Sequence, residues 1–345
     1  MKLLIITQKL NKKDDVLGFF HAWVAMFSKY FKEVIVICLE KGEYDLPKNV
    51  RVLSLGKEDG RSRLSYVFRF YKYIWQERKD YDKVFVHMNP IYIVLGGPIW
   101  KIWGKQILLW YTHKQVDFKL RVAEKFSDHI FTSIKESFTL TTKKLHVVGH
   151  GIEVNKFLCE PKTTDRPSSI LHMGRITRIK NCNVLIEAVS LLKKHFGGIH
   201  LIFAGTLITK DDFAYKQELE TLIEKYGLTN DIEFVSISYD NIKDRFCQSD
   251  LSVNLTPTGG MDKAVLSSLV AKRPVFVSNA GFSKLFGQYQ DLFIFKYCNP
   301  NDLAKKIIEY YSLSNKSSIM EDLSKNTRDD FSVESVVSKI IKICK

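Results

Sequence analysis

The stretch SILHMGRITRIKNCNVLIEAVSLLKKHF, residues 169–196, decides the fold. Residues 169–172 are predicted to form a short buried strand, and residues 181–196 carry apolar side chains at the three- and four-residue spacing of a helix. The turn between them holds two cations, Arg175 and Lys180. Because the free N–H groups of a helix N-terminus favour an anion, this pair predicts a phosphate site. Two surface charges beside a turn are the simpler alternative.

The same alternation of short apolar strands and helical segments extends along the whole chain. Before residue 150, strand-like runs at 3–7, 34–38, 50–55, 83–87 and 107–111 alternate with helix-like segments at 19–32, 64–78 and 92–104. After a polar segment the alternation starts again at residue 170. Strands rich in valine and isoleucine, separated by helices, are typical of parallel sheets covered on both faces. We therefore predict an α/β fold with two doubly wound, Rossmann-like domains.

The limits of these domains follow from the polar segment 159–169, which contains two prolines and is predicted to be a linker. A chain of 345 residues is long enough for two domains, here residues 1–160 and 161–330. Residues 331–345 are predicted to form an amphipathic helix that packs back on the first domain. Ligands of open α/β sheets bind at the carboxyl ends of the strands, so we expect the substrates in a cleft between the domains.

The charge of the chain predicts an acidic partner. Lys and Arg number 52 against 38 Asp and Glu, which leaves a net charge of +14. Nucleic acid, anionic lipid and a phosphorylated substrate are the three classes that such a balance attracts. The excess is spread along the chain and no nucleic-acid-binding motif accompanies it, so we expect no nucleic-acid partner.

Cysteine spacing and hydropathy predict a cytoplasmic protein. The six cysteines are scattered, with no C-x-x-C pair and no histidine at metal-ligand spacing, so we expect free thiols in a reducing compartment. The apolar run at residues 3–6 is too short for a signal peptide. The longest apolar stretch, 91–100, is interrupted by Gly96, Gly97 and Pro98 and is shorter than the roughly 20 residues that span a bilayer. No transmembrane segment is therefore expected.

Four motifs follow one another in a fixed order. They are HGIE at 150–153 with Phe157, GR at 174–175 with KN at 180–181, FAG at 203–205, and DKAVLSS at 262–268 followed by PV at 274–275. This ordered set resembles the retaining glycosyltransferases of family 4, which have the GT-B fold of two Rossmann-like domains. The resemblance implies a hexosyltransferase that moves a sugar from a nucleotide sugar, such as a UDP- or GDP-sugar, to a glycan or lipid-linked acceptor, without a metal cofactor.

The resemblance and the local chemistry together predict the donor site. Arg175 and Lys180 are expected to act in catalysis, because fixed cations stabilise the charge that develops on a departing diphosphate. Gly18 lies in segment 15–19, after the first strand, where a glycine either lets backbone approach a diphosphate or forms an ordinary turn. The residues expected to bind the donor are Gly18, Gly174, Gly205, Asp262, Lys263 and Ser267.

Histidines at strand ends of the first domain are the candidates for the acceptor side. His113 follows a strand, and the resemblance places it near the transferred sugar as a third catalytic residue, where it would hydrogen-bond a sugar hydroxyl or help to orient the acceptor. A histidine that is simply satisfied at a strand end is the alternative. His87 and Asn89 are expected either to contact the acceptor or to form a turn. His150, with a glycine on each side, is expected to act as a ligand or at a hinge.

Ser267 departs from the family pattern. Relatives usually carry a glutamate here whose carboxylate accepts hydrogen bonds from the ribose hydroxyls, and Gly259 stands where many have another glutamate. Serine is shorter and uncharged, so it cannot replace a two-oxygen acceptor. The alternative function is therefore a non-catalytic GT-B protein that binds a glycan or a phosphorylated ligand.

Segment 61–79 combines aromatic and basic residues. At helical spacing, one face contains Leu64, Val67, Phe68, Tyr71, Ile74 and Trp75, while Arg63, Arg69, Lys72 and Lys79 lie elsewhere. A helix that packs this apolar face against the core is the ordinary expectation. The alternative is docking on anionic lipid at the inner face of the membrane, which would suit a lipid-linked acceptor.

Overall fold

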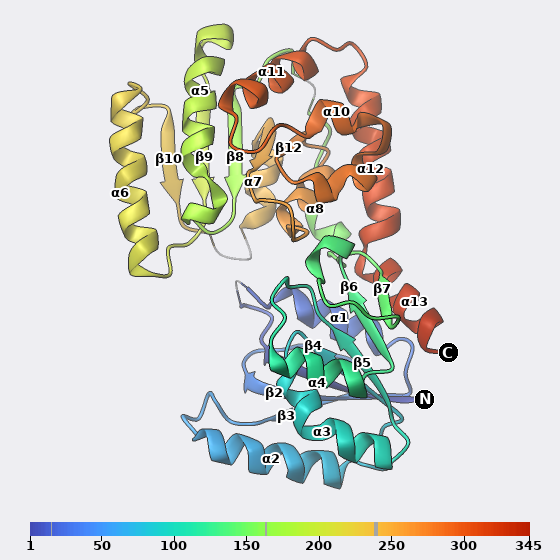
Figure 1. The fold of residues 1–345 in the computed structure, drawn as a ribbon. Coiled ribbons are helices and arrows are strands. Elements are labelled where there is room, and N and C mark those ends of the chain that lie inside the picture. Colours follow the sequence, from blue (N-terminus) through green and yellow to red (C-terminus); the bar gives the residue numbers. More distant parts are fainter. Residues whose placement is uncertain (15, 163, 238–240) are drawn as a thin grey trace. The chain divides into compact units, whose positions relative to one another are not determined.

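The computed structural model describes residues 1–14, 16–162, 164–237 and 241–345 (Figure 1). This part of the chain forms two compact units, one from Met1–Glu153 with Val333–Lys345 and one from Val154–Ser332. Segment 159–169, expected to be a linker, lies inside the second unit. Each unit contains one parallel sheet with helices packed on it, so the predicted α/β class is confirmed.

The first unit is built on a seven-stranded parallel sheet of order β3-β2-β1-β4-β5-β6-β7. Its strands are β1 Lys2–Leu10, β2 Glu33–Lys41, β3 Val50–Ser54, β4 Lys83–His87, β5 Gln106–Trp110, β6 His129–Thr132 and β7 Leu145–Val147. Its helices are α1 Phe19–Phe27, α2 Arg63–Gln76, α3 Ile91–Ile102, α4 Phe118–Phe126 and α13 Val333–Cys344.

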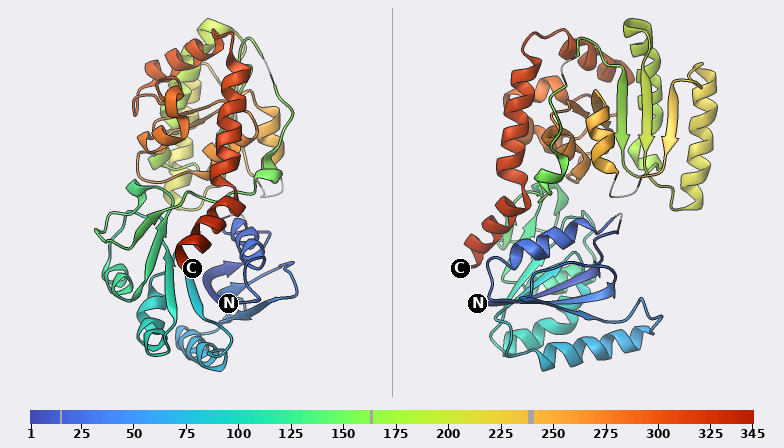
Figure 2. Two further views of the ribbon diagram at one scale, coloured as in Figure 1. Left: turned by 90° about the vertical axis from the view of Figure 1, so that its right-hand side faces the viewer. Right: turned by 180° about the vertical axis from the view of Figure 1, so that it is seen from behind.

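The alternation of side chains along β1 explains why helices cover both faces of this sheet. Leu3 and Ile5 enter one hydrophobic cluster, whereas Leu4 and Ile6 enter another. Successive side chains of a strand point to opposite faces, so a continuous apolar run requires cover on each side. The first cluster lies under α1 and α13, and the second lies under α2, α3 and α4 (Figure 2).

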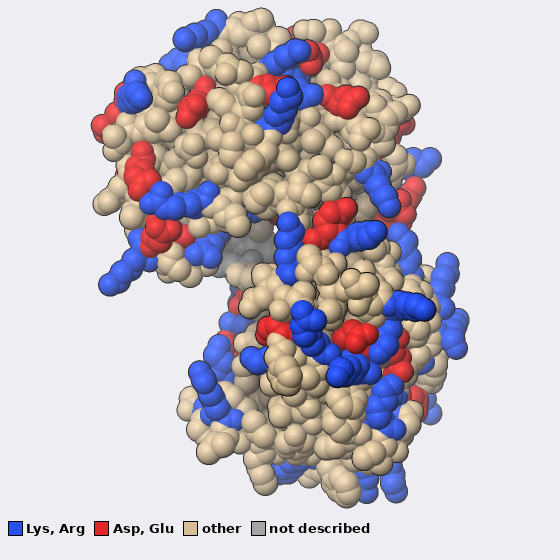
Figure 3. Space-filling model, in the orientation of Figure 1, with Lys and Arg blue, Asp and Glu red and all other residues tan. Residues whose placement is uncertain are grey.

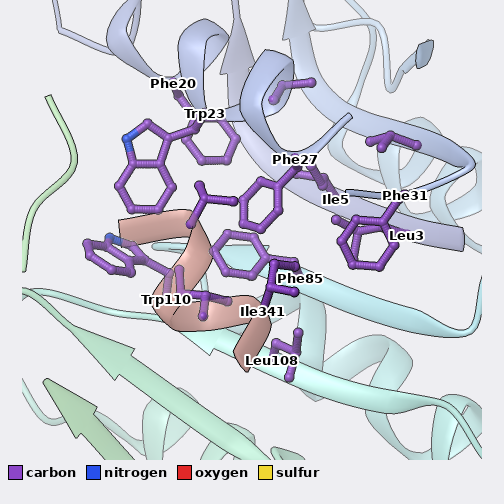
Figure 4. Close-up of a cluster of buried hydrophobic side chains, with 14 of the residues drawn as sticks. Leu3, Ile5, Phe20, Trp23, Phe27, Phe31, Phe85, Leu108, Trp110 and Ile341 are labelled. Atoms are coloured by element: carbon purple, nitrogen blue, oxygen red, sulfur yellow. The ribbon is translucent and has the colours of Figure 1, made fainter. Parts of the chain in front are cut away.

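Helix α13 completes the core of the first unit, although it comes from the end of the chain. Its Val336, Val337 and Ile340 are fully buried. Figure 4 shows Ile341 of this helix beside the aromatic residues of α1 and of the sheet. The backbone N–H of Val333 donates to the carbonyl of Ile152 at 3.0 Å, which joins the start of α13 to the first unit.

The second unit contains a five-stranded parallel sheet of order β10-β9-β8-β11-β12. Its strands are β8 Ser169–Met173, β9 His200–Ala204, β10 Ile232–Val235, β11 Leu251–Asn254 and β12 Val275–Val277. The helices are α5 Cys182–Phe196, α6 Lys210–Lys225, α7 Ile242–Gln248, α8 Lys263–Val270, α9 Ser283–Phe286, α10 Gln290–Phe293, α11 Pro300–Tyr311 and α12 Lys316–Phe331. Helix α5 packs against α6 and α11, and α8 packs against α12.

The expectation that α2 packs its Leu64 to Trp75 face on the core is wrong. Of the six residues predicted for that face only Ile74 is buried, and Leu64 is 83% exposed. The helix instead packs through Phe70 and Ile74, with Tyr66 and Tyr73 partly buried beside them. Helix α2 has apolar side chains around most of its circumference, so their spacing alone could not identify the face that meets the sheet.

The expectation of free thiols is also wrong for two of the six cysteines. Cys159 and Cys247, 88 residues apart, form a disulfide in the second unit. Cys247 belongs to α7, and Cys159 follows a 3₁₀ turn at Val154–Phe157 that packs against the same helix. Cys38, Cys182, Cys298 and Cys344 are free thiols.

In the described part of the chain no helix combines the length and the apolar character that crossing a bilayer requires.

Candidate active site

The strand order of the second unit identifies one edge of its sheet as the place for a ligand. The order reverses between β8 and β11, which are neighbours although two strands follow β8 along the chain before β11. Loops that leave two such strands turn to opposite faces and open a crevice at the carboxyl ends. The loop after β8 carries Gly174, Arg175 and Lys180, and the loop after β11 leads to Asp262. Topology therefore brings both parts of the predicted donor site to one location.

Two glycines allow the backbone to pass very closely at this edge. A Cβ atom on Gly205 would lie 1.8 Å from the carbonyl oxygen of Gly174, a distance that no side chain tolerates. Gly174 itself has φ +141°, a value that L side chains rarely adopt. Its N–H donates to the carbonyl of Ala204 at 2.9 Å, which joins the ends of β8 and β9. Both glycines are therefore required by the shape of the loops.

Arg175 is held in place by a buried carboxylate. Its Nε donates to Asp212 Oδ2 at 3.0 Å, and its Nη2 donates to both carboxylate oxygens at 2.8 and 3.1 Å. Burial opposes ionisation of Asp212, but hydrogen bonds from the backbone N–H groups of Thr209 and Ile208, and from Arg175, hold its pKa well below the usual value. The Arg175 side chain keeps 40% of its surface exposed, so it can still meet a ligand.

Lys180 is likewise paired, on the other side of the switch point. Its Nζ donates to Asp262 Oδ2 at 2.5 Å and to the Thr256 hydroxyl at 2.7 Å. Asn254 Nδ2 donates to the same carboxylate oxygen at 2.9 Å. Burial disfavours the charged form of Asp262, but the Lys180 ammonium outweighs it and lowers the pKa of the carboxyl. The loop after β8, the end of β11 and the start of α8 are thereby joined through the Asp262 carboxylate.

Helix α8 carries the remaining predicted donor residues. Asp262 caps the helix by accepting from the backbone N–H of Ala264 at 3.1 Å. Burial lowers the pKa of the adjacent Lys263 ammonium to about 7, although the Asp262 carboxylate opposes this shift. Ser267 lies one turn further and is only 4% exposed. The hydroxyl therefore stands on the buried side of the helix, at the position where the family pattern has a carboxylate.

The sequence reasoning missed Asp212, which orients Arg175. Asp212 forms a capping box with Thr209: the Thr209 hydroxyl accepts from the Asp212 N–H at 3.3 Å, and Asp212 Oδ2 accepts from the Thr209 N–H at 2.8 Å. The pattern T-x-x-D before a helix was a detectable signal for the cap. Nothing in this pattern indicated that Asp212 would pair with Arg175, which lies 37 residues away in the sequence.

In the first unit the candidates for the acceptor side also meet at a switch point, here between β1 and β4. The Thr7 hydroxyl and His87 Nδ1 lie 3.3 Å apart, and Asn89 Nδ2 donates to Gln8 Oε1 at 3.1 Å. The His87 ring stacks on Phe20 with 3.9 Å between ring centroids. The structure therefore places His87 and Asn89 at the carboxyl end of β4, beside Thr7 and Gln8 in the second half of β1.

His150 lies near His87, and His113 lies apart from them. The ring of Phe19 is 6.0 Å from that of His87 and 5.6 Å from that of His150, centroid to centroid. His113 follows β5 and is exposed, with Nδ1 accepting from the backbone N–H of Gln115 at 3.1 Å. His87 and His150 are buried, with 2% and 7% of their surface exposed.

Gly18 occupies a turn that explains it without a ligand. Its N–H donates to the Asp14 carbonyl at 2.9 Å, and a Cβ atom there would lie 2.5 Å from the same oxygen. Asp15, the first residue of the segment in which Gly18 was singled out, lies outside the described residues. A role of Gly18 in donor binding remains a prediction.

No cluster suited to a metal ion occurs in the described residues. Groups of three or more His, Cys, Asp or Glu side chains placed to hold an ion are absent from this part of the chain. Asp212 and Asp262, the acidic residues of the site, already accept hydrogen bonds from Arg175 and Lys180.

Comparison with known proteins gives a family match and several structural likenesses. Residues 146–330 match the family model described as glycosyl transferases group 1. No curated protein matches the chain.

The structural likenesses cover the whole chain. HepE of Anabaena, in complex with UDP-glucose, is similar with a TM-score of 0.75 at 15% identity over 100% of this chain and 99% of that chain. Sucrose-phosphate synthase of Thermosynechococcus elongatus has a TM-score of 0.76 at 12% identity, covering 99% and 98%. A glycosyltransferase of Rickettsia africae has 0.74 at 14%, covering 98% and 97%. These likenesses establish the fold, and the predicted GT-B fold with two Rossmann-like domains is confirmed.

Replacing Gly205 tests the close backbone contact at the site. Gly205→Ala is expected to lower the free energy of unfolding by at least about 2 kcal/mol, because its methyl group would force the Gly174 carbonyl away. Urea denaturation measures this change. Gly198→Ala is the matched control, since no atom lies within 4 Å of a Cβ there, and its effect should stay within about 1 kcal/mol. Equal effects of the two variants would contradict the role of the contact.

Replacing Asp212 tests the buried support of Arg175. Asp212→Asn is expected to cost about 1–3 kcal/mol of stability, because its amide NH₂ would face N–H donors that now share a carboxylate. The neighbouring Asp211, with an exposed side chain paired to Arg178, provides the control. Asp211→Asn should change stability by less than about 0.5 kcal/mol. The interpretation fails if chemical denaturation gives the same midpoint for both variants.

Proposed function

This chain belongs to the glycosyl transferases group 1 family, and on that basis we propose that it transfers a hexosyl group from a nucleotide sugar with retention of anomeric configuration. The observation that carries the proposal is the pair of fixed cations, Arg175 and Lys180, at the switch point of the second sheet. The backbone carbonyl of Gly174 lies directly against Gly205 beside these cations, in a space that a side chain at Gly205 would occupy. A diphosphate is the ligand whose charge and size suit this arrangement.

The chemistry follows from where charge develops. When the bond between the sugar and the diphosphate breaks, negative charge grows on the departing phosphate oxygen, and cations already fixed nearby stabilise it without reorganisation. Arg175 offers a planar group for two oxygens, and Lys180 offers a point charge. Asp212 and Asp262 keep both cations in place before the donor arrives. Arg175 and Lys180 are thus proposed as catalytic residues, with Gly174, Gly205, Asp262 and Lys263 around the donor.

The donor and acceptor classes are inferred from different parts of the chain. The HepE structure contains UDP-glucose, which supports a UDP-sugar as the donor here. For the acceptor, a glycan or lipid-linked sugar, we propose the strand ends of the first unit, where Asn89 bonds to Gln8 and where His87 and His150 both contact the Phe19 ring. His113 is proposed to act near the transferred sugar.

Ser267 supports a second candidate function, a GT-B protein that binds a phosphorylated ligand or glycan without transfer. Its hydroxyl, 4% exposed on α8, stands where a ribose-binding carboxylate is usual in the family. Diphosphate binding would persist in such a protein, because the cations are present. Turnover would be missing.

Turnover of UDP-glucose, with and without an acceptor glycan, tests the proposed activity. Lys180→Gln is expected to lower kcat/KM for donor cleavage or transfer by about 10²–10³-fold, the usual loss when one preorganised charge-stabilising group is removed. Arg178→Gln is the control, because Arg178 lies two residues away with its charge in an exposed pair with Glu218. Its kcat/KM should stay within about threefold of the native value.

Binding measurements separate the two candidate functions. A panel of UDP- and GDP-sugars is titrated calorimetrically into the native protein and into its Lys180→Gln and Arg178→Gln variants. Binding that depends on Lys180 but comes without turnover would favour the non-catalytic function. Absence of binding and turnover with every sugar of the panel would contradict the proposed transfer from a UDP- or GDP-sugar.

The absent ribose carboxylate gives a gain-of-function prediction. Ser267→Glu is expected to tighten binding of the preferred nucleotide sugar by about tenfold or more, since a carboxylate accepting from ribose hydroxyls forms strong charge-assisted hydrogen bonds. Ser267→Ala, which removes the hydroxyl and adds no acceptor, should leave the affinity nearly unchanged. Calorimetric titration gives both values, and thermal unfolding confirms that each variant folds. An unchanged dissociation constant in a folded Ser267→Glu protein would refute the prediction.

A further inference from the structure

Helix α2 carries an apolar stripe that faces away from its own core. Leu64, Phe68 and Trp75 are 83%, 72% and 58% exposed, and Val67 and Tyr71 between them are exposed as well. These residues recur at three- and four-residue spacing, so they form one continuous line along the helix. Scattered exposed apolar residues are ordinary, but a contiguous line of large ones marks a surface that meets another apolar phase.

The end of α3 extends this stripe into a wider surface. Trp75 and Trp103 lie 5.8 Å apart, ring centroid to ring centroid, and Ile102 is 83% exposed. A shallow groove lies between the two helices, lined among others by Phe68, Tyr71, Trp75 and Trp103. We call the exposed apolar residues of α2 and of the end of α3 the α2–α3 surface: Leu64, Val67, Phe68, Tyr71, Trp75 and Ile102. Trp103, which follows α3 and is partly buried, borders this surface.

The α2–α3 surface is rigidly presented. Phe70 and Ile74, on the opposite side of α2, are buried in the core of the first unit. The helix begins at a cap in which the Ser62 hydroxyl accepts from the Ser65 N–H at 3.3 Å, and the Tyr71 hydroxyl donates to the Leu95 carbonyl on α3 at 3.1 Å. Because other side chains already anchor the helix, the exposed stripe is available for contacts outside the unit.

The charge around this surface is basic. Neither α2 nor α3 contains an acidic residue, whereas α2 contains Arg63, Arg69 and Lys72 and α3 contains Lys101. Lys79 follows α2, and the Arg78 guanidinium lies 4.5 Å from the ring centroid of Trp75. In Figure 3 the charged atoms along the lower edge of the first unit, where Figure 1 places α2, belong to Lys and Arg.

The net charge of the chain is concentrated in the same unit. Residues of the first unit include 29 Lys and Arg against 17 Asp and Glu, which is +12 of the total of +14. The second unit, with 23 against 21, is nearly neutral. The expectation that the excess is spread along the chain is therefore wrong. An attractive field of this kind acts on a polyanionic surface that approaches the first unit.

We propose that the α2–α3 surface docks on the interface of an anionic lipid bilayer. Its large apolar side chains would enter the level of the acyl chain ends, Trp75 and Tyr71 would lie among the headgroups, and Lys72, Lys79 and Arg63 would meet lipid phosphates. Nucleic acid would satisfy the cations but would leave Leu64, Phe68 and Ile102 in water. This docking goes beyond the proposed sugar transfer, because its residues belong to the first unit and the cations of the donor site to the second.

Vesicle flotation of the full chain tests the docking. The protein should float with vesicles of phosphatidylcholine containing phosphatidylglycerol, and much less with phosphatidylcholine alone. Leu64→Ser with Phe68→Ser should reduce the partition coefficient at least about tenfold, and Lys72→Glu with Lys79→Glu should do the same, since each basic residue near an anionic bilayer contributes about a fivefold factor. Circular dichroism and calorimetric UDP binding should be unchanged in both pairs, because all four side chains are exposed.

Matched control variants test whether vesicle binding depends specifically on the α2–α3 surface. Phe118→Ser removes an aromatic side chain that is 77% exposed at the start of α4, and Lys143→Glu reverses an exposed charge elsewhere in the first unit. Neither should change flotation more than about twofold. The fluorescence of Trp75 provides a second measurement: emission should shift to shorter wavelength with anionic vesicles in the native protein and not in Trp75→Phe.

Three outcomes would overturn the docking. Failure to float with anionic vesicles is the first. The second is flotation that the α2 variants and the controls reduce equally. The third is a dimer or a nucleic-acid complex, seen by analytical ultracentrifugation, that Leu64→Ser with Phe68→Ser abolishes while vesicle binding persists. None of these results would bear on the proposed sugar transfer, which is measured with soluble donor and through Lys180.

Discussion

Each cation of the candidate donor site depends on a carboxylate partner, fully buried for Asp212 and partly buried for Asp262. Asp212 orients Arg175 and Asp262 orients Lys180, and the pKa of each carboxyl is lowered, so both carboxyls stay ionised at neutral pH. Two fixed cations, each paired with a carboxylate, thus stand at the strand ends before any ligand arrives. The work of placing it is done when the protein folds, and a diphosphate meets an arrangement that needs no further ordering.

Two parts of the site differ in how far the sequence could predict them. The strand, turn and helix around Arg175 and Lys180 are local, so spacing and turn residues within about thirty positions were sufficient. Asp212 lies 37 residues from Arg175, and the partners of Lys180 lie more than 70 residues away. Such contacts depend on strand order, and the reversal between β8 and β11 is a property of the assembled sheet. The cations were predictable, and their pairing was not.

Helix α2 and the disulfide are two further features whose packing could not be predicted from the sequence. A helical stripe was recognised at Leu64 to Trp75, but of its residues only Ile74 meets the core, where it packs together with Phe70 from outside the stripe. Cys159 and Cys247, which lie in different parts of the chain, meet only because the segment after residue 154 packs on α7. In both cases the sequence contained the side chains, and packing determined their surroundings.

The distribution of charge connects the donor site with the α2–α3 surface. Cations near the donor site are matched by carboxylates, as Asp212 and Asp262 illustrate, and the second unit is nearly neutral. A small ligand held by specific hydrogen bonds needs no long-range field. A bilayer offers no specific partner, only a dense layer of negative charge, so an unmatched excess of +12 in the first unit is effective there. The paired cations of the donor site therefore suit a diphosphate, which is bound through specific hydrogen bonds. The net positive charge of the first unit suits a bilayer, which attracts it through its high density of negative charge.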